Sequence, residues 1–128
     1  MKDVESFVLC VEDDPDTQEM LGVLLQERGY RFKAVDNCAE ALNLLRQVKV
    51  SLLLLDNQLP DGAGVDLCEE VRRFDKNLPI IFLSGSAYDS AREVALRAGA
   101  NAFLTKPIEL EALYRTVARW TTISADSV

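Results

Sequence analysis

Polar side chains follow four separate apolar segments of the chain. Glu12 and Asp13 come directly after one segment, Asp56 ends a run of four leucines, Ser84 closes a third segment, and Lys106 follows a fourth. Carboxylates can hold a hard divalent cation, and an aspartate can also accept a phosphoryl group. A lysine and a hydroxyl can neutralise and bond the oxygens of that group. If the segments lie side by side, these residues could therefore perform metal-assisted phosphoryl transfer to an aspartate.

The apolar segments are typical of strands buried on both faces of a parallel sheet. Carboxyl ends of parallel strands lie at one edge of the sheet, where open α/β sheets form their ligand crevice. The polar residues that follow the strands are therefore expected to meet there. A fifth segment, Arg31–Val35, is weaker and edge-like and is not followed by a residue of this set. In chain order the five expected strands are Phe7–Val11, Arg31–Val35, Ser51–Leu55, Pro79–Leu83 and Ala102–Thr105.

Helical patterns fill the intervals between the expected strands. Asp14 before Pro15 predicts an N-cap, Asn37 with Glu40 resembles a capping box, and Gly99 is expected to end a helix. Apolar positions repeat at helical spacing around residues 20–25, 41–48, 65–71, 87–98 and 110–120. Strands that alternate with helices predict an α/β fold, a doubly wound five-stranded parallel sheet with five helices on its two faces.

Composition and charge exclude several classes of protein. The 128 residues, 48% of them hydrophobic, suffice for one domain with its own core, and no apolar run is long enough to span a membrane. The first residues lack the regions of a secretory signal, so we expect a cytoplasmic protein without membrane contact. A net charge of −7 argues against direct binding of nucleic acid. The absence of histidine excludes Ser-His-Asp catalysis, histidine-ligated zinc and a phosphohistidine-donor role.

The predicted crevice needs a cation. Two carboxylates about 4 Å apart repel by roughly 4 kcal/mol at an effective dielectric constant of about 20. Mg²⁺ suits such a site because it takes one or two carboxylates, several waters and a phosphate oxygen, and Mn²⁺ could replace it. The Lys106 ammonium would pair with a second phosphate oxygen and the Ser84 hydroxyl with a third. Pro107 allows a cis peptide bond, which would turn Lys106 into the crevice.

Some of these residues have simpler interpretations. Asp14 is better explained as an N-cap than as a metal ligand, because Pro15 follows it. Asp61 belongs to the turn chemistry of Pro60-Asp61-Gly62. Ser84 could be only a strand-end hydroxyl.

The aromatic and sulfur-containing residues are also ambiguous. Phe103 could be plain core, and Tyr114 and Trp120 could either pack the last helix or contact a partner. The cysteines have no CxxC spacing and are interpreted as buried, inert thiols, at Cys10, Cys38 and Cys68.

Together the motifs resemble those of the receiver domain of response regulators in two-component signalling. The resemblance covers essentially the whole chain and implies a flavodoxin-like fold with strand order 2-1-3-4-5. It also implies a receiver domain over residues 1–123 and a polar tail over 124–128. The matching elements, in order, are Glu12-Asp13, Asp56-x-x-x-Pro60-x-x-x-Gly64, Ser84 and Lys106-Pro107.

The resemblance assigns a role to each residue of the crevice. Asp56 would be the phosphoacceptor, and Lys106 would pair with the phosphoryl group. Asp13 would bind Mg²⁺ directly and Glu12 mainly through a metal-bound water. Asp56 and the backbone carbonyl of Gln58 would complete the protein ligands.

Other residues would switch the domain or set the lifetime of the phosphorylated state. Ser84 would be the switch hydroxyl, and Phe103 would be the aromatic side chain that reorients between states. Gln58 and Ser86 occupy positions that tune how long the phosphoryl group survives. The chain departs from the commonest pattern in having Glu12 for aspartate and Ser84 for threonine.

The implied function is a phosphorylation-dependent signalling switch. A sensor histidine kinase or a phosphotransfer protein would donate the phosphoryl group. The face made by the fourth helix, the fifth strand and the fifth helix would then regulate a downstream protein or an output domain, and phosphorylation could promote a homodimer. The domain would be no enzyme beyond catalysing its own phosphorylation and dephosphorylation.

Three other classes fit less well. A pseudo-receiver would share the fold and act only as a protein-binding module, yet it would usually lack an acidic residue, the phosphoacceptor or the lysine. A haloacid-dehalogenase-type phosphatase needs a second acid two residues after its aspartyl nucleophile, where this chain has Gln58. Nucleotide-binding folds need a phosphate-binding motif, GxGxxG or GxxxxGK[ST], and neither occurs in this chain.

Overall fold

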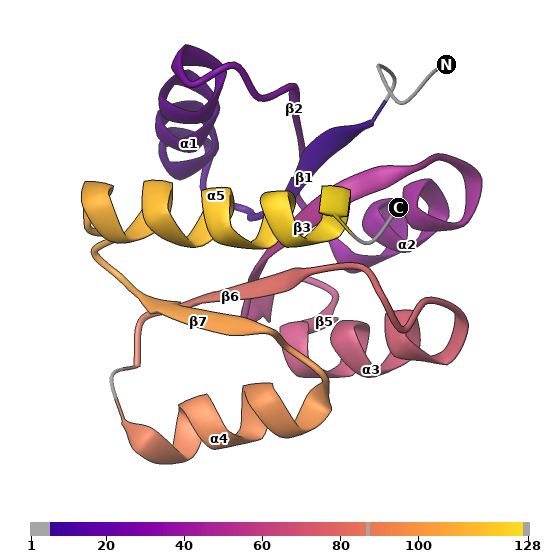
Figure 1. The fold of residues 1–128 in the computed structure, drawn as a ribbon. Coiled ribbons are helices and arrows are strands. Elements are labelled where there is room, and N and C mark those ends of the chain that lie inside the picture. The colour runs from indigo at the N-terminus through magenta and orange to yellow at the C-terminus, as the bar shows by residue number, and fades with distance from the viewer. Residues whose placement is uncertain (1–5, 87, 127–128) are drawn as a thin grey trace.

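The central sheet has the predicted architecture. The computed structural model describes residues 6–86 and 88–126, within which a five-stranded parallel sheet has the order β2-β1-β3-β6-β7 (Figure 1). Because β6 and β7 are the fourth and fifth strands of this sheet, the predicted flavodoxin-like order 2-1-3-4-5 is confirmed. The strands are β1 (Phe7–Val11), β2 (Phe32–Val35), β3 (Val50–Asp56), β6 (Ile80–Ser84) and β7 (Ala102–Thr105).

Helices cover both faces of the sheet (Figure 1). Core residues of α1 and α5 pack with one face, and core residues of α2, α3 and α4 pack with the other. Within the described residues, no helix is both long enough and apolar enough to cross a lipid bilayer. The helices are α1 (Pro15–Glu27), α2 (Cys38–Gln47), α3 (Gly64–Phe74), α4 (Asp89–Ala98) and α5 (Leu110–Asp126).

The run of leucines in β3 is explained by burial on two sides. Leu53 and Leu55 belong to the core under α2, α3 and α4, whereas Leu52 and Leu54 belong to the core under α1 and α5. All four are 0% exposed. Because complete burial of a leucine side chain contributes about 2 kcal/mol, β3 is firmly held, and so is the residue at its end.

The predicted helix ends are confirmed by their hydrogen bonds. The Asp14 carboxylate accepts from the Thr17 N–H, which makes Asp14 the N-cap of α1. The Asn37 side chain accepts from the Glu40 N–H and caps α2. Gly99 ends α4 with a φ of 117°, a left-handed conformation that glycine adopts without strain.

A short hairpin between β3 and α3 was not predicted. Strand β4 (Gln58–Leu59) pairs antiparallel with β5 (Gly62–Ala63), and the turn between them contains Asp61. The turn interpretation of Asp61 was correct, but two residues per strand are too few to show an alternating pattern in the sequence. This hairpin begins two residues after Asp56, so it belongs to the surroundings of the predicted crevice.

Smaller differences concern helix boundaries and one thiol. The fourth helix begins at Asp89, and Ala87, its predicted start, lies outside the described residues. Helix α5 continues to Asp126, past the predicted start of a polar tail at residue 124, and residues 127–128 lie outside the described part. Cys10 and Cys68 are buried as predicted, whereas Cys38 is half-buried.

Candidate functional site

The predicted residues meet in one cleft at the carboxyl edge of the sheet. The strand order reverses between β1 and β3, and open α/β sheets place their ligand crevice at such a point. A cleft of about 1050 Å³ opens there. Its lining includes Glu12, Asp13, Asp56, Ser84 and Lys106.

Three carboxylates of this cleft form a compact acidic cluster. One oxygen each from Glu12, Asp13 and Asp56 lie within 4.8 Å of one another. Glu12 is 1% exposed and Asp56 8% exposed, while Asp13 is open to solvent. At such separations each pair of charges repels by about 3–4 kcal/mol if the effective dielectric constant is near 20. The all-oxygen donor set, the excess of negative charge and the solvent-open side at Asp13 all suit Mg²⁺, which prefers few carboxylates and keeps several waters.

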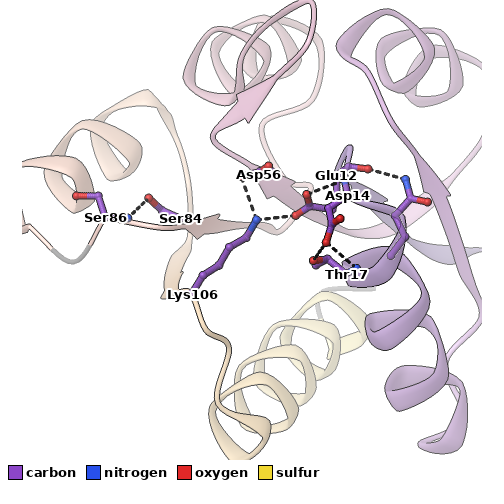
Figure 2. Close-up of polar contacts among 8 residues, drawn as sticks. Glu12, Asp14, Thr17, Asp56, Ser84, Ser86 and Lys106 are labelled. Carbon is purple, nitrogen blue, oxygen red and sulfur yellow. Dashed lines mark hydrogen bonds and ion pairs between the residues drawn. The ribbon is translucent and has the colours of Figure 1, made fainter.

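Lys106 supplies the positive charge inside the cleft (Figure 2). Its Nζ lies 2.7 Å from Glu12 Oε1 and 3.4 Å from Asp56 Oδ1. The Lys106 N–H donates to the Ser84 carbonyl at 2.7 Å, which ties the end of β7 to the end of β6. The Lys106–Pro107 peptide bond is cis. The ammonium thus lies between two of the three acids and partly offsets their repulsion.

Burial and charge act in opposite directions on this ion pair. Burial raises the pKa of the Glu12 carboxyl, although its hydrogen bond to Lys106 opposes the rise. Burial by itself would lower the pKa of Lys106, but the hydrogen bond to Glu12 and the charge of Asp56 outweigh it and raise that pKa. Lys106 therefore stays an ammonium, and the buried Glu12 carboxylate gains from any further cation.

The hydroxyl and the aromatic ring predicted to switch together lie beside a second cavity. Ser84 is 3% exposed, and its Oγ accepts from the Ser86 N–H at 3.1 Å (Figure 2). Ser84 also lines a neighbouring cavity of about 220 Å³ between the sheet and α4. The half-buried Phe103 of β7 lines the same cavity. A movement of Ser84 toward the cleft would therefore change the space that is open to Phe103.

Gly64, the last residue of the motif that begins at Asp56, must be glycine because of the neighbouring backbone. A Cβ at Gly64 would lie 2.4 Å from the carbonyl oxygen of Asp56, closer than real Cβ atoms come. The Gly64 N–H donates to the Asn57 carbonyl at 2.7 Å and closes the base of the β4–β5 hairpin. Gln58, on β4, lines the cleft. The spacing from Asp56 to Gly64 thus reflects how closely α3 starts behind β3.

Two polar side chains that line the cleft, those of Tyr88 and Asn57, were not predicted from the sequence. Tyr88 lines the rim of the cleft. Asn57 lines both the cleft and the cavity beside Phe103, and its Oδ1 is buried without a hydrogen-bond partner. Side chains alternate along a strand, so position 57 could have been placed on the side of Leu55, toward α4. Nothing in the sequence marks Tyr88.

Known proteins are similar to this chain in sequence. A 14.6 kDa protein of Leptolyngbya boryana is 37% identical over 88% of this chain and 88% of its own length. The sensor histidine kinase GacS of Pseudomonas protegens is 33% identical over 89% of this chain, but the match spans only 13% of that kinase. The chain is therefore similar to one small protein along most of its length and to one segment of a much longer one.

A related solved structure contains a magnesium ion. The receiver domain of a Pseudomonas aeruginosa sensor histidine kinase, with a magnesium ion coordinated in its active-site cleft, superposes with a TM-score of 0.83. It is 31% identical, and the match covers 91% of this chain and 98% of that domain. The family profile described as the response regulator receiver domain matches residues 8–118. The chain belongs to this family, the receiver domains of the response regulators of two-component systems.

Proposed function

We propose that this domain is a phosphorylation-dependent signalling switch whose phosphoacceptor is Asp56. The observation that carries the proposal is the meeting of Asp56 with Glu12, Asp13, Ser84 and Lys106 in one cleft. A carboxylate near an ammonium, a hydroxyl and two further acids has what an acyl phosphate needs. It can attack phosphorus, and its neighbours can balance the charge of the transferred group.

In the proposed reaction a carboxylate oxygen of Asp56 attacks the phosphorus of a phosphohistidine. The phosphorus–nitrogen bond breaks, the imidazole leaves with the electron pair, and an aspartyl phosphate forms. Lys106 Nζ, already 3.4 Å from Asp56 Oδ1, is placed to pair with one phosphoryl oxygen. The Ser84 hydroxyl can donate to another. The donor would be a sensor histidine kinase or a phosphotransfer protein.

The acidic cluster fits a divalent cation, and we propose Mg²⁺. Glu12, Asp13 and Asp56 would hold it, with the backbone carbonyl of Gln58 as a further ligand, and Mn²⁺ could take its place. When bound, the cation supplies charge neutralisation for the phosphoryl oxygens. Asp13, the exposed member of the cluster, leaves room for water, and Glu12 is the longer arm expected to act through such a water.

The signal would reach the surface through Ser84 and Phe103. If Ser84 moves to bond a phosphoryl oxygen, it gives up its present contact with the Ser86 N–H and leaves space beside the cavity that Phe103 lines. Rotation of Phe103 into that space would alter the face formed by α4, β7 and α5. Gln58 and Ser86 border the cleft, where they could tune how long the phosphoryl group survives.

The α4–β7–α5 face suggests the chemistry of the partner. A groove of about 470 Å³ runs over it and is lined by Arg92, Arg115 and Arg119 together with apolar residues such as Trp120. Among the described residues that line it, none is acidic. An acidic segment of a downstream protein or output domain would complement these arginines, whereas a homodimer made by the same groove would set arginine against arginine.

The domain would catalyse only its own phosphorylation and dephosphorylation, in the cytoplasm, without contacting nucleic acid or membrane. Incubation with acetyl phosphate and Mg²⁺, followed by intact-mass measurement, tests the proposal. We expect a gain of one phosphoryl mass that is lost in Asp56→Asn and without Mg²⁺. An unmodified wild-type protein that still binds Mg²⁺ would instead favour the alternative, a pseudo-receiver that acts as a protein-binding module.

A further inference from the structure

The tip of the β4–β5 hairpin is attached to a helix that is distant in sequence. The Asp61 carboxylate accepts from the Cys38 N–H at 2.7 Å through Oδ1 and from the Ala39 N–H at 3.1 Å through Oδ2. Cys38 and Ala39 are the first two residues of α2. One side chain of the loop after Asp56 thus holds the start of another element.

These two bonds complete the cap of α2. The first N–H groups of a helix lack partners inside the helix. The N-cap Asn37 serves the Glu40 N–H through its side chain at 2.8 Å and the Ala41 N–H through its carbonyl at 3.3 Å. Asp61 accepts from the two remaining N–H groups, those of Cys38 and Ala39. The helix therefore has a local cap at Asn37 and a separate cap delivered by the hairpin.

The hairpin needs such an attachment because little else holds it. Its ladder is two residue pairs long, and a two-stranded hairpin is marginal by itself. Its base is closed by the Gly64–Asn57 hydrogen bond, and Leu59 packs against the core, but Pro60 and the residues from Asp61 to Ala63 are exposed. Asp61 is the point at which the tip is fastened to the body of the domain.

The first strand of this hairpin is also a wall of the cleft. Gln58, Leu59 and Pro60 line it beside Glu12 and Asp56. Fixing the tip on α2 therefore fixes the wall in which the Gln58 backbone lies. We propose that Asp61 is a positioning residue for the metal site, which holds the Gln58 backbone in place by clamping the hairpin to α2. This inference rests on the proposed Mg²⁺ site, to which Asp61 itself contributes no ligand.

The test compares Mg²⁺ affinity in three variants by calorimetric titration of the unphosphorylated domain with MgCl₂. Asp61→Ala removes the clamp and should weaken Mg²⁺ binding about threefold to tenfold, the lower end of what residues that orient metal ligands contribute. Asn37→Ala removes the local cap of α2 and should lower the stability of the domain, but it should leave the Mg²⁺ affinity within about twofold of the wild type. Asp66→Asn removes another exposed charge beside the hairpin, in the first turn of α3, and should also stay within about twofold.

Amide exchange provides a second readout because coupling between sites is reciprocal. In the wild type, saturating Mg²⁺ should slow exchange of the Cys38 and Ala39 amides by the same factor that Asp61→Ala loses in affinity. Two results would overturn the inference: Asp61→Ala binding Mg²⁺ as tightly as the wild type, or Asn37→Ala losing as much affinity as Asp61→Ala. A wild-type domain that binds no Mg²⁺ at all would contradict the proposed function itself, so the two failures are distinguishable.

Discussion

The ion pair of the cleft leads to a quantitative prediction for Lys106→Met, which keeps an unbranched side chain only one atom shorter and removes the charge. Lys106 Nζ lies 2.7 Å from Glu12 Oε1, and the Glu12 side chain is 1% exposed. Without the ammonium, three carboxylates face one another with no cation between them. The variant should therefore be less stable in the absence of metal.

The magnitude follows from burial. Removing one partner of a buried ion pair costs about 3–5 kcal/mol. The Lys106 side chain is 29% exposed, so water reaches the pair and the lower end, about 3 kcal/mol, applies near neutral pH. The Glu12 carboxylate can lose its charge by taking up a proton, which costs about 1.4 kcal/mol for each pH unit by which the pH exceeds the pKa of the carboxyl. Removing Lys106 takes away the hydrogen bond and the charge that oppose the rise, so the pKa of Glu12 should be higher in the variant than in the wild type. The deficit in stability should therefore be smaller near pH 5 than near pH 7.

Urea unfolding at about pH 7 and about pH 5, with and without Mg²⁺, measures these differences. Mg²⁺ should narrow the gap between variant and wild type, because the metal replaces the lost cation, and the variant should bind Mg²⁺ more tightly. Lys76→Met, at an exposed lysine, is the control and should stay within about 0.5 kcal/mol of the wild type. A deficit that is the same at both pH values and unaffected by Mg²⁺ would show that only packing of the lysine stem was lost, and would contradict the proposed role of the Lys106 charge.

Three further predictions concern neighbouring residues. Ser84→Ala should still be phosphorylated but should show smaller NMR shift changes in α4 and β7 on phosphorylation; shifts equal to the wild type would contradict the proposed switch. Mg²⁺ affinity should fall as pH falls through the raised pKa of Glu12, because the proton and the cation compete for the same carboxylate. In calorimetric titrations the Mg²⁺ affinity of Glu12→Gln should depend less on pH than that of the wild type. The same pH dependence in both proteins would exclude Glu12 as the cause. Gly64→Ala should lower the free energy of unfolding in urea by more than about 2 kcal/mol, because the new Cβ would meet the Asp56 carbonyl. Gly85→Ala, where a Cβ has open space, should lower it by about 0.5 kcal/mol or less. Equal losses in the two variants would disprove the close approach at Gly64.

The fold was predictable because its signals are local. Leu52 to Leu55 form an uninterrupted apolar run because both faces of β3 are covered, so the residue types alone predict that burial. Asp14 and Gly99 mark helix ends by their own side-chain and backbone chemistry. The convergence of the site followed from the strands alone, since parallel strands end at one edge.

What the sequence did not reveal depends on contacts between distant residues. Asp61 reads as a turn residue, which it is, but its bonds to Cys38 and Ala39 exist only once α2 stands beside the hairpin. Lys106 was assigned to a phosphate, while the fold pairs it first with Glu12. Distances within the acidic cluster, which decide how strongly it attracts a cation, likewise come only from the folded chain.

Chemical reduction followed by peptide sequencing can identify the residue that carries the phosphoryl group. The wild-type domain is treated with acetyl phosphate and Mg²⁺, reduced with borohydride, digested and sequenced by tandem mass spectrometry. Because borohydride converts an aspartyl phosphate to homoserine, we expect homoserine at position 56 and aspartate at positions 13 and 61. Homoserine at another position, or aspartate at position 56 in a sample whose intact mass shows phosphorylation, would contradict Asp56 as the phosphoacceptor.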